Sequence, residues 1–198
     1  MLLIGQGKKL VSYARTIIEH HVKQLEIPNS RDDSFLEEKE GAFVTLHTYP
    51  DHDLRGCIGI PEPVMSLKKA IKEASISATH DPRFEPLRSD ELNSIIVEVT
   101  VLTPPELLHI KHPEEYLNTV IVGKHGLIIR RGRYSGLLLP QVPVEQGWIV
   151  EEFLSQTCYK AWLPPDAWKD HQTKVFIFSG QIFTEVEPYG QVQEKPLA

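Results

Sequence analysis

The sequence predicts an α+β fold with two subdomains, each an antiparallel sheet with flanking helices, and a cleft between them. Segments with strand character follow one another as hairpins, and they do not alternate with helices as parallel βαβ units require. Two prolines after Thr103 mark a change from long elements to short strands and glycine-containing turns. We therefore expect a larger subdomain at 1–104 and 172–198, and a smaller one inserted at 105–171, which together form one domain.

The composition is that of a globular protein, with 198 residues of which 41% are apolar and 24% are charged. The net charge of -6 argues against a protein that binds nucleic acid or a membrane surface by electrostatics. Cys57 and Cys158 have no metal or redox spacing, so we expect two reduced thiols in a cytoplasmic protein. No apolar run approaches the about 20 residues of a membrane helix.

The first half of the chain predicts two helices and two strands before the next long strand. An apolar stripe at helical spacing indicates a helix over 8–25, which a proline ends. After a polar loop, β-branched and aromatic residues predict strands at 41–48 and 54–60, paired as an antiparallel hairpin. A second apolar stripe predicts a helix that begins at Pro63 and runs through Thr79.

The segment 94–102 alternates clearly and predicts a strand, with its isoleucine and valines on one face and Glu98 and Thr100 on the other. Beyond the prolines the elements are shorter. They are predicted as strands at 120–122, 127–130 and 137–139, a helix at 145–161, one or two final strands over 174–179 and 181–186, and a surface tail from Glu187.

The stretch 54–60 concentrates chemical groups within an otherwise apolar run. Cys57 is a candidate catalytic nucleophile, because a thiol reacts as its thiolate and a nearby cation raises the thiolate fraction. Arg55, two residues away on the same face of a strand, could supply that cation. Gly56 and Gly59 would let a ligand or another backbone approach closely. The alternative is that Cys57 is a small buried residue and the glycines mark a bulge.

Other candidate substrate-binding residues lie in two irregular segments. Asp81 and Arg83 flank a proline, and they could either line the site or form an ion pair that closes a loop. Gln141 offers both a hydrogen-bond donor and an acceptor, and could point into the cleft from the opposite side. Glu145 could also bind substrate, or it could be a carboxylate that suits the dipole at the start of a helix.

The nine histidines show no spacing typical of a metal site, so we expect neither a metal nor a cofactor. His47 or His80 could act as a base for Cys57 only if tertiary structure brings them together. The basic turn 130–134 is interpreted as a solvated hairpin tip in an acidic chain.

These residues resemble the AMMECR family over nearly the whole chain. The hallmark of that family is the string Leu-Arg-Gly-Cys-Ile-Gly, which stands here at 54–59. The other matching segments are Gly41–Leu46, Asp81–Pro86, Gly126–Leu127, Leu139–Val142, Trp148, Glu152–Leu154 and Cys158–Ala161. Two residues depart from the family pattern near helix ends: Trp162 stands where the family usually has glycine, and Ile149 where it commonly has aspartate.

The resemblance implies two subdomains joined by two connections, with the hallmark motif facing the cleft, and no established activity. It implies a site made of Arg55, Gly56, Cys57, Gly59, Asp81, Arg83, Gln141 and Glu145. Microbial relatives are associated with a Memo-like protein and a radical S-adenosylmethionine enzyme, which implies protein partners in a shared modification pathway.

Two functions from different classes are compatible with these residues. The first is an enzyme or enzyme accessory that uses Cys57 as nucleophile or covalent carrier, with Arg55 lowering the pKa of the thiol and Asp81 or Gln141 positioning the substrate. The second is a binding adaptor that clamps a peptide or protein in the cleft. Nucleic-acid binding is disfavoured by the net charge of -6.

Overall fold

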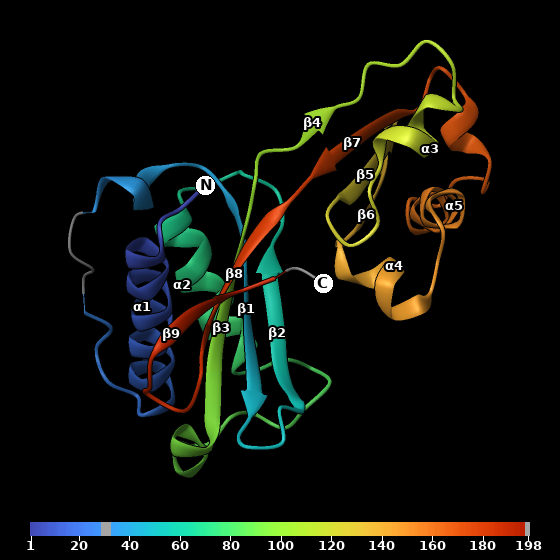
Figure 1. Cartoon of the computed structure of the whole chain (residues 1–198). Helices are drawn as coiled ribbons and strands as arrows, with labels where there is room; N and C mark the ends of the chain where they lie inside the picture. Colours follow the sequence, from blue (N-terminus) through green and yellow to red (C-terminus); the bar gives the residue numbers. More distant parts are fainter. Residues whose placement is uncertain (29–32, 197–198) are drawn as a thin grey trace. The chain divides into compact units, whose positions relative to one another are not determined.

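The computed structural model describes residues 1–28 and 33–196, and it divides the chain into two compact units (Figure 1). Unit 1 comprises Met1–Leu102 and Gln181–Pro196, and unit 2 comprises Thr103–Gly180. Each unit contains helices and its own antiparallel sheet, so the predicted α+β class is confirmed. In the described part of the chain, no helix has the length and hydropathy needed to cross a membrane.

Unit 1 is built on a five-stranded sheet with the order β2-β1-β3-β8-β9. Its strands are β1 (Gly41–Thr48), β2 (Leu54–Ile60), β3 (Ile95–Leu102), β8 (Gly180–Glu185) and β9 (Val192–Lys195). The predicted hairpin is confirmed, because β1 and β2 pair antiparallel over the expected residues. The tail from Glu187 was predicted to lie on the surface, and most of its described residues are exposed, but it also contributes β9, which pairs with β8 and packs Val192 against the core.

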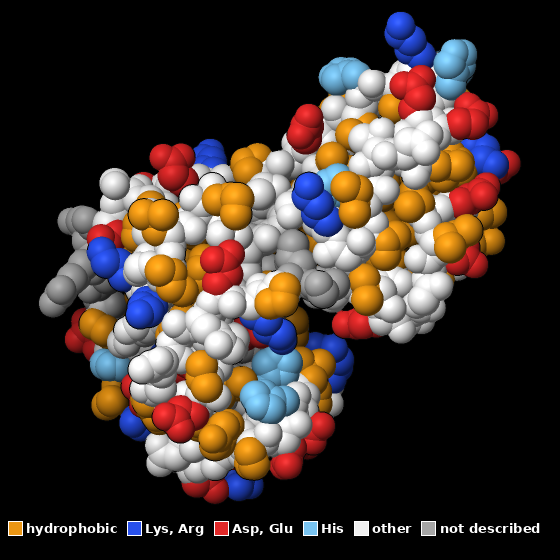
Figure 2. Space-filling view, in the orientation of Figure 1, with side chains coloured by type: hydrophobic (Ala, Val, Ile, Leu, Met, Phe, Trp, Pro, Cys, Tyr) orange, Lys and Arg blue, Asp and Glu red, His pale blue; other side chains and the backbone are white. Residues whose placement is uncertain are grey.

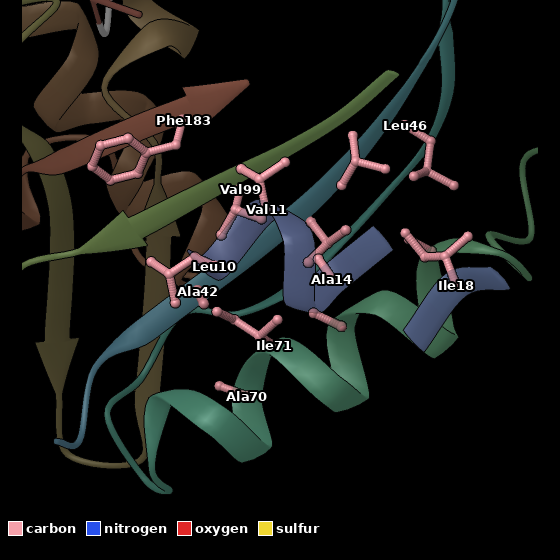
Figure 3. Close-up of a cluster of buried hydrophobic side chains, with 14 of the residues drawn as sticks. Leu10, Val11, Ala14, Ile18, Ala42, Leu46, Ala70, Ile71, Val99 and Phe183 are labelled. Atoms are coloured by element: carbon pink, nitrogen blue, oxygen red, sulfur yellow. The ribbon is translucent and has the colours of Figure 1, made fainter. Parts of the chain in front are cut away.

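Two helices, α1 (Ile4–Val22) and α2 (Leu67–Ala78), cover one face of this sheet (Figure 1). Their apolar stripes meet the inward-facing side chains of the strands in a closed core, and each fully buried large side chain contributes about 1.5–3 kcal/mol. Figure 3 shows part of that core: Leu10, Val11, Ala14, Ile18, Ala42, Leu46, Ala70, Ile71, Val99 and Phe183.

The predicted start of α2 at Pro63 is wrong. The backbone at Ser66 is extended and forms an isolated bridge with Lys39, so the helix begins only at Leu67. Val64, which the predicted helix would include, is 61% exposed. At the start of the chain, α1 begins at Ile4 rather than at the predicted residue 8.

Unit 2 has a four-stranded sheet with the order β4-β7-β5-β6. Its strands are β4 (Glu106–Leu107), β5 (Gly126–Arg131), β6 (Tyr134–Leu138) and β7 (Lys174–Phe178), and its helices are α3 (Glu115–Thr119), α4 (Gln141–Gln146) and α5 (Val150–Lys160). Short 3-10 helices lie at η1 (Ser34–Glu37) and η2 (Ser89–Ser94) in unit 1 and at η3 (Ala167–Lys169) in unit 2.

Three predictions for this region differ from the structure. Residues 120–122 are not a strand, since they follow α3 in a turn, and β7 takes the place of the missing strand beside β5. Because β7 belongs to this sheet, the chain returns to unit 1 after Gly180 rather than at residue 172. The single helix predicted at 145–161 is two helices, because Gly147 ends α4 with a left-handed φ of 66°.

A buried ion pair ties α1 to the sheet of unit 1. The guanidinium of Arg15 forms a two-bond fork with the carboxylate of Glu185, and both side chains are almost inaccessible to solvent. Arg15 also donates to the carbonyls of Leu92 and Ile95, and Glu185 accepts from the Val97 N–H. Such a pair is favourable only when its remaining donors and acceptors are used, as they are here.

We expect Arg15→Met to destabilise unit 1 by about 3–5 kcal/mol, because it leaves the Glu185 carboxylate buried without its cation. The measurement is the free energy of unfolding in urea. Lys9→Met is the matched control, since Lys9 pairs with Asp33 at the surface, and it should cost less than about 1 kcal/mol. Equal losses in the two variants would contradict the assigned role of the buried pair.

We expect Trp162→Gly to raise the free energy of unfolding by about 0.5–1 kcal/mol, because only glycine adopts a left-handed backbone without a steric cost. Trp162 follows α5 with a φ of 59°, and it is 87% exposed, so little packing is lost. Trp162→Ala keeps the Cβ and should bring no such gain. A stabilisation of the same size in both variants would assign the effect to the indole instead.

Candidate functional site

Cys57 lies on β2, the edge strand of the five-stranded sheet. Its N–H donates to Asp81 Oδ2 over 2.9 Å, and its carbonyl accepts from Arg83 Nη2 over 3.2 Å. The two side chains therefore take the positions that a neighbouring strand would use, and they close the open edge of the sheet at this residue. The segment after α2 thus holds the backbone of Cys57 in place.

The carboxylate of Asp81 holds Arg83 and Cys57 in this arrangement through its hydrogen bonds. It accepts two bonds from the Arg83 guanidinium, at 3.0 and 2.6 Å, and a third from the Arg83 backbone N–H at 3.0 Å. The Asp81 side chain is 1% exposed, whereas that of Arg83 is 55% exposed. The bonds from Arg83 outweigh burial and hold the pKa of Asp81 well below its usual range. Asp81 is therefore ionised at neutral pH.

The half-buried thiol of Cys57 faces the side of the sheet that the helices leave uncovered. Thr45, directly opposite on β1, donates its hydroxyl to Cys57 Sγ over 3.2 Å. The N–H and C=O of Cys57 point away from β1, so Thr45 and Cys57 form a non-hydrogen-bonded pair of the antiparallel ladder. In pairs of this kind the two facing side chains lie closest together. Burial raises the pKa of the thiol, and the opposing effects of Thr45 and Arg83 do not cancel this rise. The thiol is therefore largely protonated at neutral pH.

Arg55 was predicted to be the cation that lowers the pKa of Cys57, and the structure corrects this prediction. The guanidinium of Arg55 forms a fork with Glu91, at 2.8 and 3.1 Å, and so connects β2 to η2. The guanidinium that lowers the pKa of the thiol belongs to Arg83. The reason is competition, since the Glu91 carboxylate is a stronger partner for an arginine than a neutral thiol is.

Gly56 and Gly59 are required by packing on opposite faces of β2. A Cβ on Gly56 would collide with the carbonyl oxygen of Ala78, the last residue of α2. A Cβ on Gly59 would collide with the ring of Phe43 on β1. The close approach foreseen for the glycines thus involves the protein itself, and a ligand contact at either one stays a prediction.

Gln141 and Glu145 both belong to α4 in unit 2. Gln141 is the first residue of this helix and is half-buried. Glu145 is exposed and lies near the end of the helix, so the prediction that it stands at a helix start is wrong. A carboxylate near the carboxyl end gains nothing from the helix dipole. The cleft, and the membership of both residues in the site of Cys57, stay predictions.

A polar row beside Cys57 is the feature that sequence reasoning missed. Thr45 pairs with Cys57 on one side and with Glu98 of β3 on the other. The carboxylate of Glu98 lies 3.9 Å from His47 Nε2 and 3.4 Å from Lys195 Nζ. Figure 2 shows histidine side chains gathered beside a Lys or Arg side chain on the face of unit 1 in view. The alternation of apolar and polar residues in β3 predicted the face on which Glu98 lies. The position of Lys195 follows only from the pairing of β9 with the sheet.

Cys158, the second thiol, lies fully buried in the core of unit 2 on α5. Both cysteines are free, and burial raises the pKa of Cys158 to about 11. Among residues 1–28 and 33–196, no three His, Cys, Asp or Glu side chains converge as a metal site would require. Cys158 therefore provides an inert reference for Cys57.

Comparison with known proteins places the chain among relatives of the same length. The profile of the AMMECR1 family matches residues 11–183. Protein MJ0810 of Methanocaldococcus jannaschii is 54% identical over 100% of this chain and 98% of its own length. Protein MK0488 of Methanopyrus kandleri is 50% identical over 100% of this chain and 97% of its own. The crystal structure of uncharacterized protein PH0010 from Pyrococcus horikoshii matches with a TM-score of 0.82 and 48% identity, covering 96% of each chain.

We expect Asp81→Asn to lower the free energy of unfolding by about 2–3 kcal/mol at pH 7, because it removes a charged acceptor from buried hydrogen bonds. The folded pKa of Asp81 lies below the unfolded value of about 3.9, so this contribution is complete above pH 4. It is lost as the pH falls toward the folded pKa. The difference between wild type and variant, measured by urea unfolding, should therefore be constant from pH 7 to 5 and shrink below pH 4.

Asp90→Asn is the matched control, because Asp90 pairs with Arg88 in solvent. It should leave stability unchanged across the same pH series. A difference between wild type and Asp81→Asn that persists undiminished at the lowest pH would show that the ionised carboxylate is not the stabilising form.

Proposed function

Because the chain belongs to the AMMECR1 family, whose relatives named above carry no assigned activity, we propose that it is an enzyme or enzyme accessory whose reacting group is the Cys57 thiol. The observation that carries this proposal is the pair of side chains, Asp81 and Arg83, that holds both backbone polar groups of Cys57. The same pair also brings the Arg83 guanidinium beside the thiol, where it lowers the pKa of the thiol, and a cysteine that only fills space has no use for such a cation.

The environment suits a thiol that reacts with a bound, already electrophilic substrate. Burial keeps the Cys57 thiol protonated. The thiol therefore resists oxidation, because a cysteine is oxidised more readily the larger its thiolate fraction. In the proposed step, the sulfur of Cys57 bonds to a substrate carbon, the leaving group departs with its bonding electrons, and that group takes up the thiol proton. The exposed guanidinium of Arg83 is always charged and lies beside this residue, so it stabilises negative charge that develops there.

A second candidate function, a protein-binding adaptor, is supported by a different observation. Trp162 and Tyr159, at the end of α5 in unit 2, are 87% and 55% exposed. Exposed tryptophan and tyrosine are favoured anchors in protein interfaces. In this role Cys57 would serve packing alone, and the predicted partners would be the Memo-like and radical S-adenosylmethionine proteins of a cytoplasmic pathway.

We expect iodoacetamide to modify Cys57 in the native protein, with a rate that still rises above the ordinary thiol pKa, while Cys158 stays unmodified. The pH profile of alkylation, read by mass spectrometry of peptides, measures this. Arg83→Gln should slow the reaction several-fold at pH 8, because it removes the cation that lowers the pKa of the thiol.

Arg55→Gln is the matched control and should leave the rate unchanged, since Arg55 is engaged by Glu91. Arg83→Lys should restore part of the rate. If Cys57 stays inert until the protein unfolds, the thiol proposal fails and the adaptor becomes the better candidate.

A further inference from the structure

Three carboxylates are buried among the described residues of unit 1, and they differ in how well they are satisfied. Asp81 accepts four hydrogen bonds of 2.6–3.0 Å from Arg83 and Cys57. Glu185 accepts the fork from Arg15 and a bond of 2.9 Å from the Val97 N–H. Among the described residues, Glu98 has only the long contacts of 3.4 and 3.9 Å to Lys195 and His47. A buried carboxylate that lacks short bonds has acceptor capacity to spare.

Glu98 also opens onto a cavity of about 350 Å³ that lies entirely within unit 1. Its walls include His47, Glu98 and Lys195, together with Ile96, Thr184 and Gln193. The Nδ1 atom of His47 is buried and has no hydrogen-bond partner among the described residues. Polar groups left incomplete around one cavity are typical of a ligand site.

The charge of Glu98 is maintained although its residue is only 7% exposed. Burial raises the pKa of this carboxyl, but His47 and Lys195 together outweigh burial, and the net pKa lies below the ordinary value. Lys195, the last residue of β9, is 52% exposed and can swing into solvent. A cation from outside can therefore take its place beside a carboxylate that is already ionised.

We propose that this cavity binds an ammonium or guanidinium group, held by Glu98 in place of Lys195. The proposal deepens the function proposed above and rests on it for the role of the thiol: the substrate of Cys57 is an amine- or guanidine-bearing molecule. Cys57 on β2 and Glu98 on β3 lie on either side of Thr45 on β1. The two residues are therefore two strand spacings apart, which is about 10 Å. The reacting carbon therefore lies several bonds away from the cationic group.

A cation fits the cavity better than an anion does. An anionic ligand would have to displace or face Glu98, and separating a buried carboxylate from its cations without replacing them is costly. An ammonium group instead replaces a contact of 3.4 Å by a short charge-assisted hydrogen bond, and it releases Lys195 to water.

The test is an NMR titration of the full-length protein with n-butylammonium and, separately, with butanoate, which has the same chain length and the opposite charge. We expect butylammonium to shift the amide signals of β1, β3 and β9 around the cavity, and butanoate not to shift them. Glu98→Gln should weaken butylammonium binding about tenfold or more, and Lys195→Met should strengthen it by removing the competing ammonium.

Glu194→Gln is the matched control, because it removes the same charge from the neighbouring residue of β9, whose side chain bonds to Gln181 instead. It should leave binding unchanged. Binding of butanoate at the cavity, no binding of either probe, or equal weakening by Glu194→Gln would each overturn the proposal. Lys195→Met keeps the test valid if Glu98→Gln does not fold.

The same titration on Cys57→Ser separates this inference from the proposed function. Binding at Glu98 does not use the thiol, so we expect it to persist in this variant. An inert Cys57 together with butylammonium binding would reject the reacting thiol alone. A reactive Cys57 without butylammonium binding would reject the cation site alone.

Discussion

The buried carboxylate of Asp81 is the interaction on which the arrangement around Cys57 depends. It fixes Arg83 by a two-bond fork, and the pair then bonds to the N–H and the carbonyl of Cys57. Edge strands expose such groups, and proteins usually cover or disrupt them. Here the cover is made of charged side chains, so it also brings a guanidinium beside the thiol. One ion pair therefore closes the edge of the sheet and defines the electrostatics of the candidate site.

The two faces of the five-stranded sheet have different roles, since one packs the core and the other carries the candidate reactive groups. Apart from the buried pair of Arg15 and Glu185, the face toward α1 and α2 is apolar and packs the core of unit 1 (Figure 3). The opposite face carries Cys57, Thr45 and Glu98 in one row, with a cavity at its acidic end. Because successive side chains of a strand alternate between faces, the same strands serve both purposes. The rigid apolar face holds the polar row in register, which is what a reacting group needs in order to meet its substrate.

Sequence reasoning found the elements of unit 1 more reliably than the partners of its side chains. Strands β1 and β2 match their predicted bounds because their composition and alternation are local properties. Glu145 was misplaced because a glycine at residue 147 divides one predicted helix into two. Arg55 was assigned to the thiol by its spacing, yet Glu91, which lies far along the chain, engages it. Spacing along a strand predicts which face a residue lies on, and it says nothing about competing partners.

By itself, the sequence determined the α+β class, the hairpin that carries Cys57 and the family to which the chain belongs, because these depend on local pattern and on a contiguous motif. Only the tertiary structure determined that Arg83 is the arginine beside the thiol and that Glu98 and Lys195 meet. It also showed which neighbouring groups leave no room for a Cβ at the two glycines. Those features join residues that are distant in the chain. These contacts form only when β9 pairs with the rest of the sheet and the segment after α2 covers the edge strand β2. Both events depend on tertiary packing, which no local sequence pattern encodes.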